Sequence, residues 1–251
     1  MNFLRLAAAA YLLVLPSGAI AGEDVKKPRA VVELFTSQGC TSCPKADAML
    51  TEMVAQGDVV ALAYHVDYWD YLGWRDTLAN PDNTARQQEY SRTFGNRSVY
   101  TPQVVVNGRK QINGTKRLKI NHAIDRMEGT AHGMTVDVDI SYRDESIVIE
   151  TGDAGKTVED AQIVLIYFKP ATKVEIAQGN NTGRSFTYVN AVAGFHSVGM
   201  WDGSATKLEL PISEMAKKGA GGCAVLVQKM LPDGLPGPIL GSAIITRQEG
   251  W

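Results

Sequence analysis

Two cysteines three positions apart, Cys40 and Cys43, stand between an apolar segment at 30–35 and a helix-like segment. The hydrophobic patterns predict a buried strand over 30–36 and a helix over 40–56. The pair therefore lies at a strand-to-helix turn, where free backbone N–H groups and the positive end of the helix dipole stabilise a thiolate. Because thiol–disulfide exchange needs a thiolate beside a second thiol, this turn is the first candidate for a functional site.

Three chemistries are open to the two cysteines: a redox dithiol, a structural disulfide, or half of a metal site. A zinc site needs a second Cys or His pair at suitable spacing, and the histidines and Cys223 stand isolated in the sequence. Thiolates suit Cu(I), so copper handling by Cys40, Cys43 and His65 is a weaker hypothesis, beside a purely structural role for His65. The spacing favours the dithiol, and we expect neither a metal nor an organic cofactor.

The N-terminus has the pattern of a secretory signal. Arg5 supplies a positive charge, an apolar stretch follows at 6–15, and Ala19-Ile20-Ala21 matches a cleavage site. We expect a signal peptide over 1–21, cleavage after Ala21 and a flexible leader at 22–29. Since no other segment is apolar over about 18 residues, no membrane span is expected after cleavage. The predicted destination is secreted or periplasmic, where disulfides are permitted.

Composition narrows the class of protein further. The formal net charge is −2 over 251 residues, and no basic patch stands out, which argues against nucleic acid or an anionic membrane as partner. Three cysteines are too few for a disulfide-stapled scaffold, and the length allows two ordinary hydrophobic cores.

The segment 30–131 alternates strands and helices. Strands are predicted at 30–36, 59–66, 103–106 and 109–113, and helices at 40–56, 81–94 and 116–127. The first two strands with their helix form a βαβ unit, which implies parallel pairing, and Asn107-Gly108 is a hairpin signal. The pattern predicts an α/β domain with a four-stranded mixed sheet flanked by helices, interrupted by an aromatic insertion at 67–80.

From about residue 134 the pattern changes to short strands separated by Gly, Asp, Asn and Pro. Such spacing is typical of a β-sandwich, so an all-β domain is predicted over 134–251. This β-domain is a candidate for orienting a partner or for self-association.

The chain over 30–129 resembles the thioredoxin superfamily, with a glutaredoxin-like start at 33–36. The resemblance is carried by the helix-opening cysteine pair, the element order, the hairpin, and Thr101-Pro102 before the third strand. It implies that Cys40 is the attacking nucleophile, that Cys43 is the resolving thiol, and that Pro102 is cis and faces the cysteines. Thr101 would then offer backbone hydrogen bonds to an extended substrate. Sequence alone favours a trans bond before a proline.

The whole chain is also similar to a secreted thioredoxin-like family known only as a domain of unknown function. That similarity is carried by the segments at 34–40, 65–74 and 100–103. The dipeptide Thr41-Ser42 between the cysteines departs from the Gly-Pro of thioredoxins and the Pro-His of strong periplasmic oxidants, which leaves the direction of exchange open.

Four further side chains are candidates for the site. Trp69 and Trp74 in the insertion form either a platform for a peptide substrate or part of a local core. Glu33 is a candidate proton acceptor beneath the dithiol if it is buried, and an ordinary exposed residue if it faces solvent. Cys223 is interpreted as a buried, inert thiol, with a second redox role as the alternative.

The sequence thus predicts an exported thiol–disulfide oxidoreductase acting on protein or peptide thiols and disulfides of the cell envelope. The alternative is a redox-inert binding module in which the Cys40–Cys43 disulfide is permanent.

Overall fold

The computed structural model describes residues 27–155, 157–158 and 160–247. In its first half the elements follow the predicted order, with small shifts at their ends. They are β1 (Val31–Thr36), α1 (Cys43–Gln56), β2 (Val60–His65), the short 3₁₀ helix η1 (Asp70–Leu72), α2 (Pro81–Thr93), β3 (Gln103–Val106), β4 (Lys110–Asn113) and α3 (Arg117–Met127).

The second half is built mainly of strands, as predicted. The elements are β5 (Val138–Arg143), β6 (Ser146–Thr151), β7 (Ala161–Glu175), β8 (Ser185–Trp201), β9 (Thr206–Pro211), α4 (Ser213–Lys217), β10 (Gly222–Met230), the 3₁₀ helix η2 (Pro232–Gly234) and β11 (Pro236–Thr246). However, β7 and β8 are far longer than the apolar stretches in their sequences.

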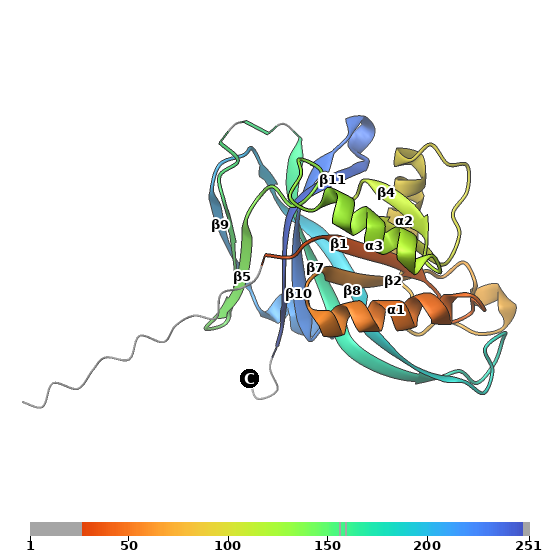
Figure 1. The fold of residues 1–251 in the computed structure, drawn as a ribbon. Helices are drawn as coiled ribbons and strands as arrows, with labels where there is room; N and C mark the ends of the chain where they lie inside the picture. The colour runs from red at the N-terminus through yellow and green to blue at the C-terminus, as the bar shows by residue number, and fades with distance from the viewer. Residues whose placement is uncertain (1–26, 156, 159, 248–251) are drawn as a thin grey trace, which may run out of the picture.

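One eight-stranded sheet runs through both halves in the order β11-β10-β7-β8-β2-β1-β3-β4. Strand β1 pairs in parallel with β2 and antiparallel with β3, and β3 continues into β4 through a hairpin. Strand β8 joins β2 in parallel at Ala191 and Ala63. A second, three-stranded sheet, β5-β6-β9, forms a separate layer beside the β10–β11 end of the large sheet (Figure 1).

The predicted fold class, a four-stranded thioredoxin-like α/β domain followed by a separate β-sandwich, is therefore wrong. The described chain is mostly β, and four strands of the second half extend the sheet of the first. The physical reason is that β7 and β10 are apolar on both faces. Ile166 and Leu226 share a core with Phe35 and Tyr64, while the opposite faces of β7 and β10 pack against the small sheet. The proposed boundary near 131–134 itself stays a prediction.

Helix α1 covers one face of the sheet (Figure 1). Val32 and Leu34 of β1 point toward this helix and pack with Ala46 and Leu50. The alternate residues of β1, with those of β2, point to the opposite face and belong to a second core that includes Tyr90 of α2. Since side chains alternate along a strand, each residue of β1 is assigned to one of these two faces.

The far end of the β7–β8 hairpin extends past β2 and α1, as the teal strands of Figure 1 show. Val174, Ile176 and Tyr188 of this end form a small core with Leu78 of the 67–80 insertion. The hairpin thereby brings residues near 180 beside the turn that carries the cysteines.

No helix in the described part of the chain is long and apolar enough to cross a membrane. The predicted signal peptide at 1–21 and its cleavage after Ala21 lie outside the described residues. Of the leader at 22–29, the described Lys27 pairs with Asp137, and Arg29 pairs with Asp58, Asp125 and Glu128.

Candidate functional site

Cys40 and Cys43 form a disulfide at the start of α1, with their Cα atoms 5.4 Å apart. The helix begins at Cys43 with Pro44 in its first turn, and Ser42 is the residue at its N-cap. The Ser42 Oγ lies 3.5 Å from the Cys40 Sγ. Both cysteines are buried, and Cys40 keeps only 2% of its surface exposed.

The Thr101–Pro102 peptide bond is cis, in agreement with what the family resemblance implies. Pro102 lies close to α1 across Gly114. A Cβ atom at Gly114 would lie 2.9 Å from the Pro102 Cβ and 3.1 Å from the Ala46 Cβ. Because Ala46 follows Cys43 within the first turn of α1, the proline loop lies near the cysteine end of the helix.

Trp69 connects the cysteine turn with the proline loop. Its Nε1 donates to Thr101 Oγ1 at 2.8 Å, and its Cβ lies 3.1 Å from the position of a Cβ at Gly39. Trp74 donates from Nε1 to Gln38 Oε1, also at 2.8 Å. Both indole rings are partly buried. The structure thus places Trp69, Trp74 and Thr101 around the disulfide, and their role in substrate binding stays a prediction.

The tip of the β7–β8 hairpin, residues 176–184, also contacts the cysteine turn. The buried Asn181 donates from Nδ2 to the backbone oxygens of Gln38, at 2.8 Å, and of Cys40, at 3.1 Å. Its Oδ1 accepts a hydrogen bond from Arg184. Sequence reasoning missed this contact, because the run Asn180–Gly183 indicates only a turn and not where that turn docks.

Glu33 is buried but lies on the face of β1 that points away from α1, since Val32 and Leu34 occupy the α1 face. Its carboxylate accepts hydrogen bonds from Arg86 Nε at 2.7 Å and from Tyr90 Oη at 2.5 Å. Gln228 of β10 bonds to the same Arg86 and Tyr90 side chains. The structure therefore places Glu33 in a polar network that joins β1, α2 and β10, apart from the cysteines.

Two carboxylates that the sequence did not single out lie near the disulfide. Asp47 follows Cys43 by one turn of α1 and accepts a hydrogen bond from Thr36 Oγ1 at 2.7 Å. Asp76, in the insertion, accepts from His65 Nδ1 at 2.9 Å and from the Gln38 backbone N–H at 2.8 Å. Cysteine at position i with a carboxylate at i+4 on one helix face is the sequence signal that could have identified Asp47.

Among the described residues, no group of three His, Cys, Asp or Glu side chains is placed so that it could hold a metal ion. Cys223 is free and buried in β10, as interpreted from its sequence context. Burial raises the pKa of its thiol to about 12, which leaves it protonated at neutral pH.

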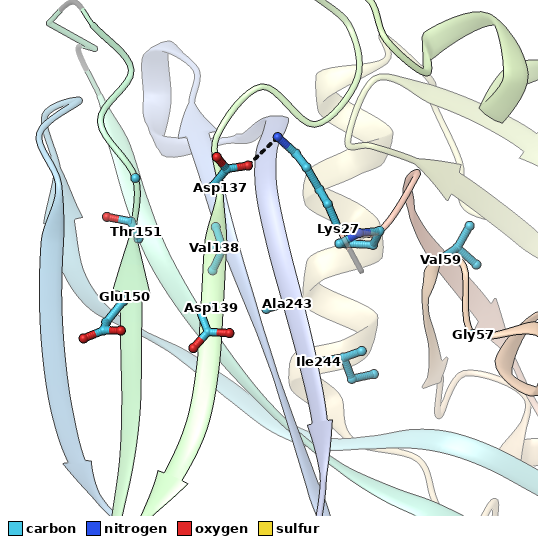
Figure 2. A pocket seen from close by; sticks show the side chains of 12 residues that line it. Lys27, Gly57, Val59, Asp137, Val138, Asp139, Glu150, Thr151, Ala243 and Ile244 are labelled. Carbon is cyan, nitrogen blue, oxygen red and sulfur yellow. Dashed lines mark hydrogen bonds and ion pairs between the residues drawn. The ribbon is translucent and has the colours of Figure 1, made fainter. Parts of the chain in front are cut away.

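A cavity of about 400 Å³ lies elsewhere, between the small sheet and the start of the described chain (Figure 2). Asp137, Asp139 and Glu150 stand along it, and Val138 and Ile244 contribute apolar surface. Lys27 pairs with Asp137 at its rim. None of the residues around the disulfide lines this cavity.

The sequence and fold are similar to those of known proteins. It matches the family profile "Protein of unknown function (DUF1223)" over residues 31–228. An X-ray crystal structure of a protein from Agrobacterium tumefaciens is similar over 90% of this chain and 97% of that one, with 40% identity and a TM-score of 0.81. HBP35 of Porphyromonas gingivalis shares the fold, with 14% identity, coverage of 90% and 77%, and a TM-score of 0.60.

Comparison with curated proteins gives no match. The family profile spans most of the chain, including the cysteine turn, the proline loop and the hairpin that docks beside them. The chain therefore belongs to the DUF1223 family of proteins of unknown function.

Proposed function

We propose that this protein is an exported thiol–disulfide oxidoreductase that acts on protein or peptide substrates through Cys40 and Cys43. The observation that carries the proposal is the closed Cys40–Cys43 disulfide at the N-terminus of α1, with the Thr101-Pro102 loop beside the same helix end. This combination resembles the active sites of the thioredoxin superfamily, although the surrounding sheet is differently built. A disulfide also agrees with an oxidising compartment, and hence with export.

In the oxidising direction, a substrate thiolate attacks the Cys40 Sγ. The Cys40–Cys43 bond breaks, its electron pair leaves on the Cys43 sulfur, and a mixed disulfide links Cys40 to the substrate. A second substrate thiolate then attacks the substrate sulfur, so that the substrate leaves oxidised and both cysteines remain reduced. In the reducing direction the same steps run backwards, and Cys43 closes on Cys40 to expel the substrate thiolate.

The surroundings of the pair favour a peptide substrate. Thr101, before the cis proline, would offer its backbone to an extended peptide, and Trp69 fixes the Thr101 side chain by a hydrogen bond. Trp69 and Trp74 are partly exposed, so each retains ring surface for an apolar side chain of the substrate.

One observation favours a second function, a redox-inert module that binds an envelope partner. Cys40 has only 2% of its surface exposed, and the hairpin tip is bonded to the carbonyl oxygens of its turn. A disulfide held this way would resist attack unless the tip moves, and it would then act as a structural link.

Turnover of a peptide that contains one disulfide, with dithiothreitol as the reductant, separates the two functions. The oxidoreductase requires catalysis by the wild type, loss of catalysis in Cys40→Ser, and a stable peptide adduct on Cys40 in Cys43→Ser. Cys223→Ser should keep the wild-type rate. If the peptide disulfide is reduced at the uncatalysed rate in the presence of each of the four proteins, and Cys40→Ser loses only stability, the binding module is the correct function.

A further inference from the structure

Two buried polar atoms near the cysteines have no hydrogen-bond partner among the described residues: Oδ2 of Asp47 and Nε2 of His65. Buried polar groups in folded proteins nearly always form hydrogen bonds, so a buried polar atom without one is unusual and can mark a functional group. Both residues are buried, and each carries one satisfied polar atom, through Thr36 for Asp47 and through Asp76 for His65. The two free atoms therefore belong to side chains whose positions are already fixed.

The strand register places both groups under α1. Thr36 and His65 are direct partners in the parallel β1–β2 pair, so their side chains point to the same face. Val32 and Leu34 of β1 show that this is the face packed against α1. Asp47, on α1, reaches down to Thr36, which confirms the direction.

Cys43 lies on the same side of the helix as Asp47. Residues four apart in an α-helix are neighbours, with Cβ atoms about 5–6 Å apart. The Cys43 sulfur and the Asp47 carboxyl group are thus within reach of one another, and both are buried. A thiol released at Cys43 would meet an acceptor oxygen that takes no hydrogen bond from any other residue in the described part of the chain.

The charges around Asp47 set how readily it takes a proton. Burial raises the pKa of Asp47 to about 7, with Asp76 adding to the rise, whereas His65 and the Thr36 hydrogen bond oppose it. Burial would lower the pKa of His65, but the Asp76 charge and hydrogen bond, with Asp47, raise it. From β8, Tyr188 faces the cluster with its ring 4.7 Å from His65, and its own pKa is raised by burial and by both aspartates.

The cluster is also tied to the cysteine turn. The Asp76 Oδ2 that accepts from His65 also accepts from the backbone N–H of Gln38, two residues before Cys40. A single carboxylate oxygen of Asp76 therefore links the imidazole to the backbone just before Cys40.

We propose that Asp47 accepts the proton of the Cys43 thiol when the disulfide closes, and that His65 and Asp76 are positioning residues that tune Asp47. This inference rests on the proposed function. In the step, the Cys43 proton passes to Asp47, the Cys43 thiolate attacks the Cys40 sulfur of the mixed disulfide, and a Cys40–Cys43 bond forms. The bond from Cys40 to the substrate sulfur breaks, and its electron pair leaves on the substrate thiolate, which takes a proton from water.

Closure of the reduced protein by glutathione disulfide, followed by acid quench and mass analysis, tests the step. At saturating glutathione disulfide the observed rate becomes the rate at which Cys43 resolves the mixed disulfide. That rate should rise between about pH 6 and 8, as Asp47 ionises. Asp47→Asn should slow it at least tenfold at pH 7 and abolish the rise, and His65→Asn should move the rise to higher pH, because the imidazolium that favours ionised Asp47 is gone.

Asp82→Asn, an exposed aspartate in the first turn of α2, is the matched control and should behave as the wild type. In a Cys43→Ser background, Asp47→Asn should leave the attack of Cys40 on glutathione disulfide unchanged within twofold. If Asp47→Asn closes at the wild-type rate with the wild-type pH profile, the proton-acceptor role is wrong and the oxidoreductase function still stands. If the reduced wild type neither forms an adduct nor closes, the proposed function fails, and this role falls with it.

Discussion

Asn181 donates from its side-chain nitrogen to the backbone oxygen of Cys40 across 3.1 Å, although 141 positions separate them in the sequence. The same nitrogen donates to the Gln38 oxygen at 2.8 Å. The tip of the β7–β8 hairpin is thus hydrogen-bonded to both ends of the segment 38–40, which leads into the disulfide. Since Cys40 is almost entirely buried, any thiol would need local movement of the protein to reach its sulfur.

Asn181→Ala should therefore speed the reduction of the disulfide. Loss of the side chain removes the donor that these two carbonyl groups share, at a cost of about 1–3 kcal/mol to the closed arrangement, and so favours states in which the tip is released. The rate of reduction by glutathione, followed by alkylation and mass, should rise about fivefold or more. The exposed Asn180 side chain makes one longer hydrogen bond to this turn within the described chain, to the Gly39 oxygen at 3.4 Å, so Asn180→Ala is the control with a smaller effect. Equal rates in wild type and Asn181→Ala would show that this contact does not limit access to the disulfide.

The buried Asp47 predicts a particular dependence of stability on pH. Burial raises its pKa to about 7 from an ordinary value of 3.8, so the folded protein holds a proton that the unfolded chain loses within this window. Stability then decreases as the pH rises through the window, and the loss is complete above it. Asp47→Asn does not titrate, and its advantage over the wild type should grow by roughly 4 kcal/mol, at about 1.4 kcal/mol per pKa unit.

Urea unfolding of both proteins at pH 4 and pH 8 measures this difference. The gap in the free energy of unfolding should be small at the lower pH and large at the higher one. A gap that is constant, or that favours the wild type at pH 8, would show that Asp47 is not destabilised by its burial.

Much of the local structure could be predicted from the sequence, and the assembly could not. Hydrophobic periodicity and turn signals locate β1, α1 and β2 because these features act over a few residues. The outer part of β7, from Ala171 to Glu175, has mostly exposed side chains and lies beyond Pro170. Hydrophobic alternation therefore does not predict that the strand continues there. The pairing of Ala63 with Ala191 joins the two halves, and nothing in either segment specifies its partner.

The candidate site shows the same division. Cys40, Cys43 and Thr101-Pro102 are recognisable from spacing and resemblance, because each sits within a short motif. Asp47 and Asp76 are not, since a carboxylate in a helix or an irregular loop is usually exposed to solvent. Only the fold shows that both are buried and that Asp76 bonds to the backbone of the cysteine turn.

Glu33 provides a test of which buried carboxylate has a structural role. Glu33→Gln would leave the buried Arg86 guanidinium without its carboxylate partner, and breaking such an ion pair costs about 3–5 kcal/mol. The free energy of unfolding should fall accordingly, while closure of the reduced disulfide keeps its pH profile. Tyr90→Phe, which removes one hydrogen bond to the Glu33 carboxylate, is the milder variant if Glu33→Gln does not fold. A stable Glu33→Gln with impaired closure would place Glu33, and not Asp47, in the exchange step.

Trp69 should matter for peptide substrates more than for small thiols. Trp69→Phe removes the hydrogen bond to Thr101 Oγ1 and keeps an aromatic side chain, with the Cβ atom that lies close to Gly39. We expect KM for a disulfide peptide to rise a few-fold, with the rate of reduction by dithiothreitol unchanged. Tyr71, which is 78% exposed in the same insertion, supplies the control Tyr71→Ala, for which both values should stay at the wild-type level. An equal loss toward peptide and dithiothreitol would mean that Trp69 only supports the fold of the cysteine turn.

The reduction potential of the Cys40–Cys43 pair tests the central claim most directly. Protein with Cys223→Ser would be equilibrated in glutathione buffers, alkylated, and read by mass. An oxidoreductase predicts a potential between about −120 and −270 mV, the range of working dithiol enzymes. A potential below about −300 mV is that of a structural disulfide and would contradict the proposed function in favour of a binding module.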